Sequence, residues 1–211
     1  MTRLKLGQRQ KYWPSRSNIP LFPPGQAYDY CNTNYALLGL IAEKIEHKPV
    51  ASVFHTRLFG PLGMRQTLLP AGTSNTLPEP YALGYLYGGP SYALADMPYP
   101  PDLRAAAKAG TPKPNDDTNQ NPSYASAAGG VISNADNLAT WIRALVGGKV
   151  LNADSQRRWF ESLEPEDPSK PDGQKYGYGI TQISFGPNSL YFHGGEMPGY
   201  TSSSALIRST K

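Results

Sequence analysis

Cysteine, histidine and long apolar runs are all scarce in this chain of 211 residues. The single cysteine, Cys31, excludes an internal disulfide. The three histidines do not have the spacing of metal ligands, so we expect no metal site and no cofactor. No apolar run approaches the ~20 residues that a membrane span needs, and the opening Met-Thr-Arg-Leu-Lys-Leu-Gly is not a signal peptide. We therefore expect no membrane-spanning segment.

Acidic residues are absent before Asp29, whereas basic residues occur there: Arg3, Lys5, Arg9, Lys11 and Arg16. A basic arm that binds DNA or anionic lipid is one interpretation. A solvated terminus is the other, and we favour it. The net charge of +4 is too small to indicate nucleic-acid binding, so we expect no nucleic-acid partner.

Proline and glycine are abundant, with 21 of each, which indicates long loops. The length suits one domain with a sizeable core. Residues 70–122 are dominated by loop-forming residues, and a helical turn is expected only over residues 103–108. The tyrosines of this loop either line a substrate cleft or pack the loop onto the body, and we favour packing: Tyr81, Tyr85, Tyr87, Tyr92 and Tyr99.

Apolar residues recur at helical spacing in the first half of the chain. One stripe follows residue 32 and comprises Tyr35, Leu38, Ile41, Ala42 and Ile45. A second helix is expected to start at Pro49 and to stop at Gly60, with its own stripe of Val50, Val53, Phe54 and Leu58. We expect both helices to bury these apolar faces against each other or against a neighbour.

The second half contains two more helical segments and then strands. Residues 133–136 have the spacing of a capping box, which places the helix start at Ser133. The stripe of this helix is Leu138, Trp141, Ile142 and Leu145, and Gly147 ends it. A further helix is expected over residues 153–163, and strands over 176–184, 190–194 and 201–207.

Tyr30 and Asn32 form a Tyr-x-Asn triplet at the start of the first expected helix. A tyrosine held in a cleft can transfer a proton once its pKa of about 10 has been lowered. An amide two residues later can orient a substrate carbonyl. The alternative interpretation is a turn tyrosine followed by an asparagine that caps the helix.

His193, Gly194 and Gly195 lie at the end of an expected strand. Paired glycines let a backbone approach a ligand closely. In the functional interpretation His193 contacts the substrate or the tyrosine, Gly195 permits the close approach, and the Glu196 amide faces a developing oxyanion. The alternative is a hairpin corner with an exposed histidine.

Four segments, in this order, resemble the penicillin-recognising serine hydrolases, a family that includes class C β-lactamases, D-alanyl-D-alanine carboxypeptidases and related esterases. They are residues 24–44 (Pro-Gly-Gln-Ala-Tyr-Asp-Tyr-Cys-Asn), 58–67 (Leu-Phe-Gly-Pro-Leu-Gly-Met), 126–133 (Ser-Ala-Ala-Gly-Gly-Val-Ile-Ser) and 193–200 (His-Gly-Gly-Glu-Met-Pro-Gly-Tyr). The resemblance implies an α+β fold of the β-lactamase/DD-peptidase type, a helical lobe with an antiparallel sheet. It implies one partial domain over residues 1–211, with the helical lobe at 23–163 and sheet strands at 176–207.

The family's mechanism, if carried over, assigns roles to the matching residues. Tyr30 would be the proton-transfer residue and Asn32 would orient the substrate, while His193, Gly194 and Gly195 would form the third motif. The family's nucleophile is the serine of a Ser-x-x-Lys motif, and no serine here has a lysine three residues later. Ser155 is followed by Arg158, but an arginine stays protonated and cannot relay a proton. We therefore expect an internal fragment, incomplete at both ends.

Two smaller departures concern the substrate. Cys31 stands where the family commonly has serine, and Gly194 stands where many members carry a hydroxyl that binds the substrate carboxylate. Loss of that donor weakens carboxylate recognition by roughly 1–3 kcal/mol, which favours an esterase-like member slightly.

The sequence thus predicts part of a serine acyl hydrolase whose acyl-serine lies outside this chain, which alone would be inactive. The substrate, a small molecule or peptide, stays open among β-lactams, D-Ala-D-Ala peptides and esters. A non-catalytic binding fragment or degenerate homologue is the alternative. Family resemblance implies a periplasmic or secreted protein, and the sequence does not indicate an oligomeric state.

Overall fold

A computed structural model of the chain describes residues 22–23, 25–70, 72, 74–94 and 98–209. The chain folds as two compact units. The first contains residues up to 74 together with 122–132, and the second contains 75–121 and 133 onward. The basic residues before Asp29 lie outside the described residues. Whether the two units make one domain, as the sequence suggests, stays a prediction.

The first unit is built on the two expected helices. Helix α2 (Asn32–Glu46) follows Cys31 and ends at His47, whose φ of 52° is left-handed. Helix α3 (Val50–Phe54) begins after Pro49 and continues into a π-helical turn, η2 (His55–Phe59), that ends at Gly60. The Glu43 carboxylate accepts a hydrogen bond of 2.9 Å from the Val50 N–H, which joins the two helices at their corner.

The predicted burial of the α2 stripe is wrong. Leu38, Ile41 and Ile45 are 55%, 45% and 70% exposed. The buried residue of α2 is Gly39, which lies against the short 3₁₀ helix η4 (Ser126–Ala128). Because a glycine permits the closest helix contact, the face that packs is the one that carries Gly39, and the bulky stripe points elsewhere. The α3 stripe does bury Val50 and Val53, as expected.

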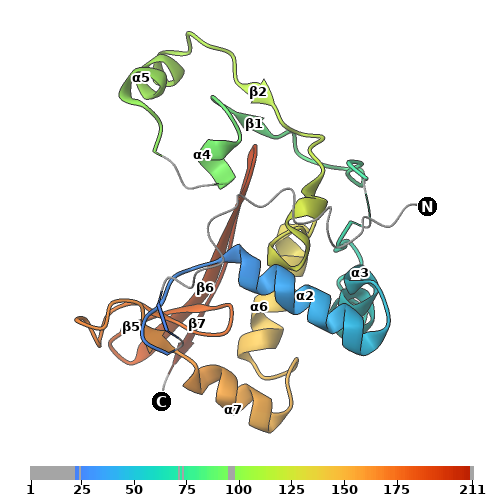
Figure 1. The fold of residues 1–211 in the computed structure, drawn as a ribbon, viewed down its shortest axis with the longest axis vertical. Coiled ribbons are helices and arrows are strands. Elements are labelled where there is room, and N and C mark those ends of the chain that lie inside the picture. Colours follow the sequence, from blue (N-terminus) through green and yellow to red (C-terminus); the bar gives the residue numbers. More distant parts are fainter. Residues whose placement is uncertain (1–21, 24, 71, 73, 95–97, 210–211) are drawn as a thin grey trace. The chain divides into compact units, whose positions relative to one another are not determined.

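The second unit contains a five-stranded antiparallel sheet whose strands follow one another in chain order. They are β3 (Glu164–Pro165), β4 (Lys175–Tyr176), β5 (Thr181–Phe185), β6 (Asn188–Met197) and β7 (Tyr200–Ser209). The predicted strands are therefore present. The first of them is interrupted at residues 177–180, where Gly179 has a φ of 75°. Strands β6 and β7 are the two long strands in Figure 1.

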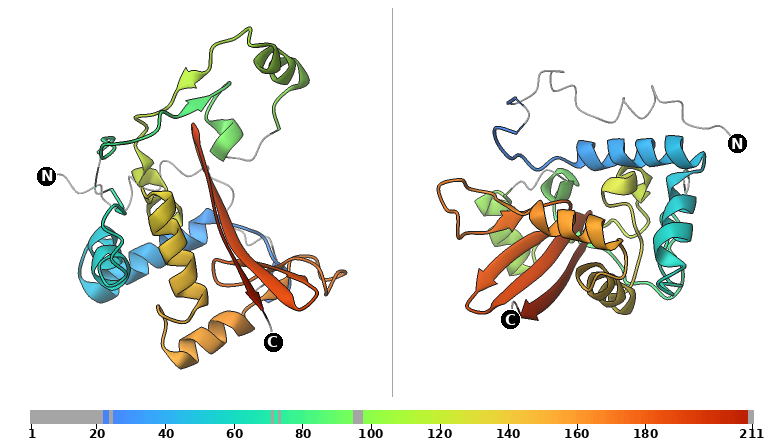
Figure 2. Two further views of the ribbon diagram at one scale, coloured as in Figure 1. Left: turned by 180° about the vertical axis from the view of Figure 1, so that it is seen from behind. Right: turned by 90° about the horizontal axis from the view of Figure 1, so that it is seen from below.

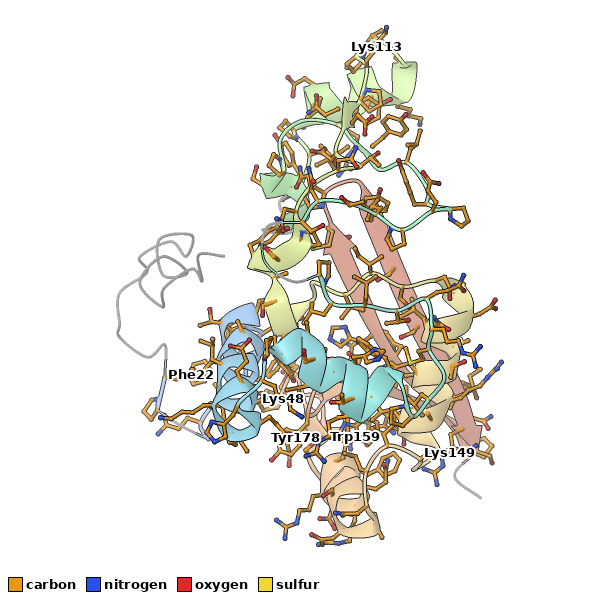
Figure 3. The ribbon with its side chains drawn as sticks, turned by 90° about the vertical axis from the view of Figure 1, so that its right-hand side faces the viewer. Phe22, Lys48, Lys113, Lys149, Trp159 and Tyr178 are labelled. Carbon is orange, nitrogen blue, oxygen red and sulfur yellow. The ribbon has the colours of Figure 1, made fainter. Side chains whose placement is uncertain are left out.

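The core of this unit lies between the sheet and two helices, α6 (Ala135–Val146) and α7 (Ala153–Glu161), which share one side of the sheet (Figure 2). Its buried members are Ile142, Val146, Trp159, Ile180 and Tyr191. The Trp159 indole Nε1–H donates a 3.0 Å hydrogen bond to the Tyr178 carbonyl, and the two residues lie side by side in Figure 3.

The start of α6 differs from the predicted capping box. Asn134, not Ser133, is the N-cap, and its side-chain oxygen accepts a 2.9 Å hydrogen bond from the Asn137 N–H. Both residues are good N-caps, so the spacing alone did not distinguish them. The predicted end at Gly147 is confirmed.

The loop segment of the second unit has more structure than predicted. It contains a two-stranded ribbon of β1 (Tyr85–Leu86) and β2 (Asn115–Asp116), and the helices α4 (Ser91–Leu94) and α5 (Pro101–Ala109). The Tyr200 hydroxyl at the tip of the β6–β7 hairpin donates a 2.9 Å hydrogen bond to the Ala82 carbonyl. The hairpin tip is therefore fastened to this segment. No helix in the described part of the chain is long and apolar enough to cross a membrane.

Candidate active site

The Tyr-x-Asn segment stands at the beginning of α2. Tyr30 precedes Cys31, the N-cap, whose side chain makes no capping hydrogen bond, and Asn32 is the first helical residue. Both Tyr30 and Asn32 are exposed. The capping interpretation of Asn32 is therefore wrong, and its amide lies at the surface of the first unit.

Tyr30 has a pKa above its ordinary value. Loss of hydration raises the pKa of Tyr30 although 47% of the residue is exposed, and electrostatic repulsion from Tyr35 raises it further. A tyrosine that acts as a base needs the opposite shift. In this chain Tyr30 is consequently a neutral phenol at neutral pH.

The His193-Gly194-Gly195 segment lies in the part of β6 that extends beyond the end of the neighbouring strand β5. Strand β5 pairs with β6 only as far as Phe192, which faces Thr181. From His193 to Met197, β6 stays paired with β7 on its other side. The second unit thus presents a strand segment with β7 along one edge and, among the described residues, no strand along the other.

The two glycines of this segment differ in the space around them. A Cβ built on Gly194 would have the Ser202 carbonyl oxygen at 3.8 Å, an ordinary contact. A Cβ on Gly195 would lie 2.9 Å from the Ser202 hydroxyl oxygen. Both glycines are exposed, so the strand backbone is accessible along this edge.

His193 is held by hydrogen bonds at both ring nitrogens. Its Nε2 lies 3.0 Å from the hydroxyl oxygen of Tyr176, and its Nδ1 lies 2.5 Å from the Gly194 carbonyl oxygen. The phenol and imidazole rings meet edge to face at 6.0 Å between centroids. His193 is half-buried, which excludes the interpretation of a hairpin corner with an exposed histidine.

Aromatic side chains of the loop segment stand beside the same strand. Tyr92 in α4 stacks on Tyr99 at 4.7 Å between ring centroids, and α4 contacts β6 (Figure 1). Burial, Tyr92 and the Glu196 carboxylate together raise the pKa of Tyr99. Glu196 itself is exposed. Tyr92 and Tyr99 therefore stack on each other within the segment, whereas Tyr81 and Tyr85 are 40% and 50% exposed. Whether the tyrosines pack the segment onto the body or line a cleft stays a prediction.

Sequence reasoning missed Tyr176. The sequence pattern places Tyr176 only in a strand, yet its hydroxyl contacts the ring of His193, which lies 17 positions later in the chain. The available signal was the run Tyr176-Gly177-Tyr178-Gly179, in which glycines flank an aromatic residue at a strand end. That run indicates a turn, but it does not indicate which side chain the turn brings to Tyr176.

Comparison with known proteins identifies the family. The model of the Beta-lactamase family matches residues 15–211. This chain belongs to the Beta-lactamase family. This match confirms the family that the four sequence segments indicate. The predicted α+β fold of the β-lactamase type is confirmed as well.

Three of the proteins that this chain is similar to are named as a D-stereospecific amidohydrolase, a D-amino acid amidase and a D-aminopeptidase. A D-stereospecific amidohydrolase from Streptomyces sp. is 28% identical, with a TM-score of 0.70 over 90% of this chain and 49% of that one. The D-amino acid amidase from Ochrobactrum anthropi SV3, complexed with L-phenylalanine amide, is 25% identical, with a TM-score of 0.62 over 89% and 51%. A D-aminopeptidase from Cereibacter sphaeroides is 38% identical over 64 residues, 30% of this chain and 12% of that protein. The chain therefore spans about half the length of the solved structures and a smaller share of the D-aminopeptidase.

Proposed function

We propose that this chain is part of an acyl hydrolase that cleaves amide bonds next to a D-amino acid residue through an acyl-serine intermediate. Membership of the Beta-lactamase family supports the reaction type, and the likeness to a D-stereospecific amidohydrolase over 90% of the chain supports the substrate class. The proposal moves the substrate away from the esters favoured by the sequence and towards amides.

The observation that carries the proposal is the stretch of β6 from His193 to Met197, which among the described residues has β7 on one side and no paired strand on the other. An extended ligand can add to such an edge through backbone hydrogen bonds, with side-chain pockets providing the specificity. The Gly194 and Gly195 positions leave room for this approach. The Glu196 N–H, on the same stretch, is the group we assign to the developing oxyanion.

The absence of a hydroxyl at position 194 fits the proposed substrate. Family members that bind a substrate carboxylate commonly carry a hydroxyl there, and Gly194 cannot donate that hydrogen bond. An amino acid amide has no free carboxylate at the bond to be cleaved, so the missing donor costs nothing in its recognition. The same glycine would weaken binding of a carboxylate-bearing substrate by about 1–3 kcal/mol.

Tyr30 and Asn32 take the proton-transfer and orienting roles in this proposal. Because the pKa of Tyr30 is raised, its phenolate forms near neutral pH only if a cation stands beside the phenol oxygen. The lysine of a Ser-x-x-Lys motif supplies such a cation in the family. No such motif occurs in the 211 residues, so we place both the serine and the lysine on polypeptide beyond this sequence.

The proposal is tested first on the gene and then on the product. We expect the DNA upstream of the Met1 codon to encode, in frame, a Ser-x-x-Lys motif several tens of residues before Tyr30. The complete protein should hydrolyse D-phenylalanine amide faster than L-phenylalanine amide, and Tyr30→Phe should lower kcat by roughly 10²–10⁴-fold, the usual size of an acid–base contribution. Equal rates for the two enantiomers would refute the assigned substrate.

A non-catalytic binding fragment is the second candidate, and the raised pKa of Tyr30 together with the missing motif favours it. Covalent labelling of the 211-residue chain distinguishes the two. Neither a β-lactam nor an activated ester should acylate one defined residue of this chain, because it lacks the nucleophile. Specific labelling, located by peptide mass spectrometry, would show that our account of the nucleophile is wrong. A stop codon just upstream of Met1 would make the binding fragment the leading function.

A further inference from the structure

The hydrogen bonds of His193 determine where its protons lie. The Gly194 carbonyl oxygen, 2.5 Å from Nδ1, can only accept a hydrogen bond. Nδ1 must therefore carry a proton. In the neutral imidazole the other nitrogen, Nε2, is then an acceptor. The group 3.0 Å from Nε2 is the Tyr176 hydroxyl, which donates this bond when the ring is neutral and would accept it only from a doubly protonated ring.

We propose that Tyr176 is a positioning residue that holds His193 in its neutral Nδ1–H tautomer and fixes the plane of its ring. For a neutral ring the two bonds are consistent only in this arrangement, because a neutral ring protonated at Nε2 would leave Nδ1 and the Gly194 carbonyl as two acceptors facing each other. The assignment needs no residue outside the second unit.

The location of Tyr176 suits this role. It lies in β4, which pairs with β3 on one side and β5 on the other, so its backbone belongs to the ladder and not to a loop. The chain turns directly after it, since the Gly177 N–H donates a 3.0 Å hydrogen bond to the Ile180 carbonyl. A Cβ on Gly177 would lie 2.6 Å from the Ser162 hydroxyl oxygen, so this tight turn requires a small residue. Tyr176 therefore approaches His193 from a constrained element.

The consequence for the reaction rests on the proposed function. Nε2 is bonded to the Tyr176 hydroxyl and Nδ1 to the Gly194 carbonyl of the same strand. His193 therefore does not serve as the base of the reaction. Its contribution is to hold in place the Gly194 carbonyl and the start of the β6 stretch from His193 to Met197. Loss of the Tyr176 hydroxyl should accordingly raise KM for an extended substrate more than it lowers kcat.

The test is nitrogen NMR of the 211-residue chain labelled with ¹⁵N-histidine. Only three histidines contribute signals, and His193→Gln identifies those of His193. We expect the native chain near neutral pH to give the signature of one tautomer, Nδ1 protonated and Nε2 not. Tyr176→Phe should shift both ring signals towards the average of two exchanging tautomers. The matched control is Tyr178→Phe, two residues later and exposed, which should leave the signals unchanged.

Two results would overturn the proposal: an Nε2-protonated His193 in the native chain, or the same signals in Tyr176→Phe as in the native chain. If Tyr176→Phe does not fold, the native chain still decides, because the ¹⁵N signals of its His193 show directly whether Nε2 carries a proton. The readout does not depend on turnover. Failure of amide hydrolysis would thus refute the proposed function and leave the assignment of Tyr176 intact.

Discussion

Gly39 lies so close to Ala127 that a Cβ built on it would be 2.7 Å from the Ala127 Cβ. This contact joins α2 to η4 within the first unit. We predict that Gly39→Ala destabilises the protein: alanine gains about 1 kcal/mol of helix propensity, but overpacking costs typically 1–3 kcal/mol. The net loss should be on the order of 1 kcal/mol, measured by urea unfolding.

A reciprocal change provides the control for this contact. Ala127→Gly removes the methyl group that the new one would strike, so the double variant Gly39→Ala/Ala127→Gly should be more stable than the sum of the two single changes predicts. Strict additivity would show that the two positions do not touch.

The exposed stripe of α2 can be made polar without loss of stability. Ile45 is 70% exposed in the last helical turn, where a cation interacts favourably with the helix dipole. We expect Ile45→Lys to change the free energy of unfolding by less than about 0.5 kcal/mol, measured by urea unfolding. Val50→Lys, at a position 6% exposed, should unfold the first unit. A similar loss in both variants would contradict the exposed position of Ile45.

The indole of Trp159 should contribute through its hydrogen bond as well as its packing. Trp159 is 4% exposed, and its Nε1–H donates to the Tyr178 carbonyl at 3.0 Å. Trp159→Phe leaves that carbonyl without its partner and shrinks the ring, which we expect to cost about 1–3 kcal/mol of unfolding free energy. The half-buried Trp141 is the matched control, and Trp141→Phe should cost clearly less in the same denaturant titration.

The pH dependence of Tyr30 follows from the sign of its shift. Burial raises the pKa of Tyr30 above its unfolded value, so the folded chain holds the phenol proton more tightly. The corresponding stability is fully present below the unfolded pKa of about 10 and is lost as pH rises through the folded pKa. Carbon NMR of ¹³C-tyrosine, with Tyr30→Phe for assignment, should place the Tyr30 midpoint above that of an unfolded peptide. A lower midpoint would mean that a cation already stands beside the phenol.

Two glycines of the hairpin should respond oppositely to the same substitution. Gly194→Ser should fold normally, since its Cβ meets nothing closer than 3.8 Å. Gly199→Ser should fail, because Gly199 has a φ of 79° and its Cβ would lie 2.6 Å from the Gly84 backbone carbon. Thermal unfolding measures both. In an active complete protein, Gly194→Ser should also improve binding of carboxylate-bearing competitors, and no improvement would argue against the role assigned to position 194.

The sequence predicted the helices and strands well because their patterns are local. Pro49, Gly60 and Gly147 mark helix boundaries that the structure confirms. The predictions that failed concern contacts between residues far apart in the sequence. The stripe that includes Ile41 is exposed because Gly39, which no apolar pattern marks, provides the contact with η4. Tyr176 was missed for the same reason, since its partner His193 is set by the pairing of three strands. The roles of Tyr30, Asn32 and His193 stay predictions.

The fastening of the β6–β7 tip has a mechanical consequence. Tyr200 bonds to the Ala82 carbonyl, and Gly199 packs on the Gly84 backbone so closely that no side chain fits between them. Residues 82–84 are therefore held against the turn between β6 and β7. We expect a displacement of this turn to move residues 82–84 with it, and a displacement of residues 82–84 to be transmitted to the strand that carries His193.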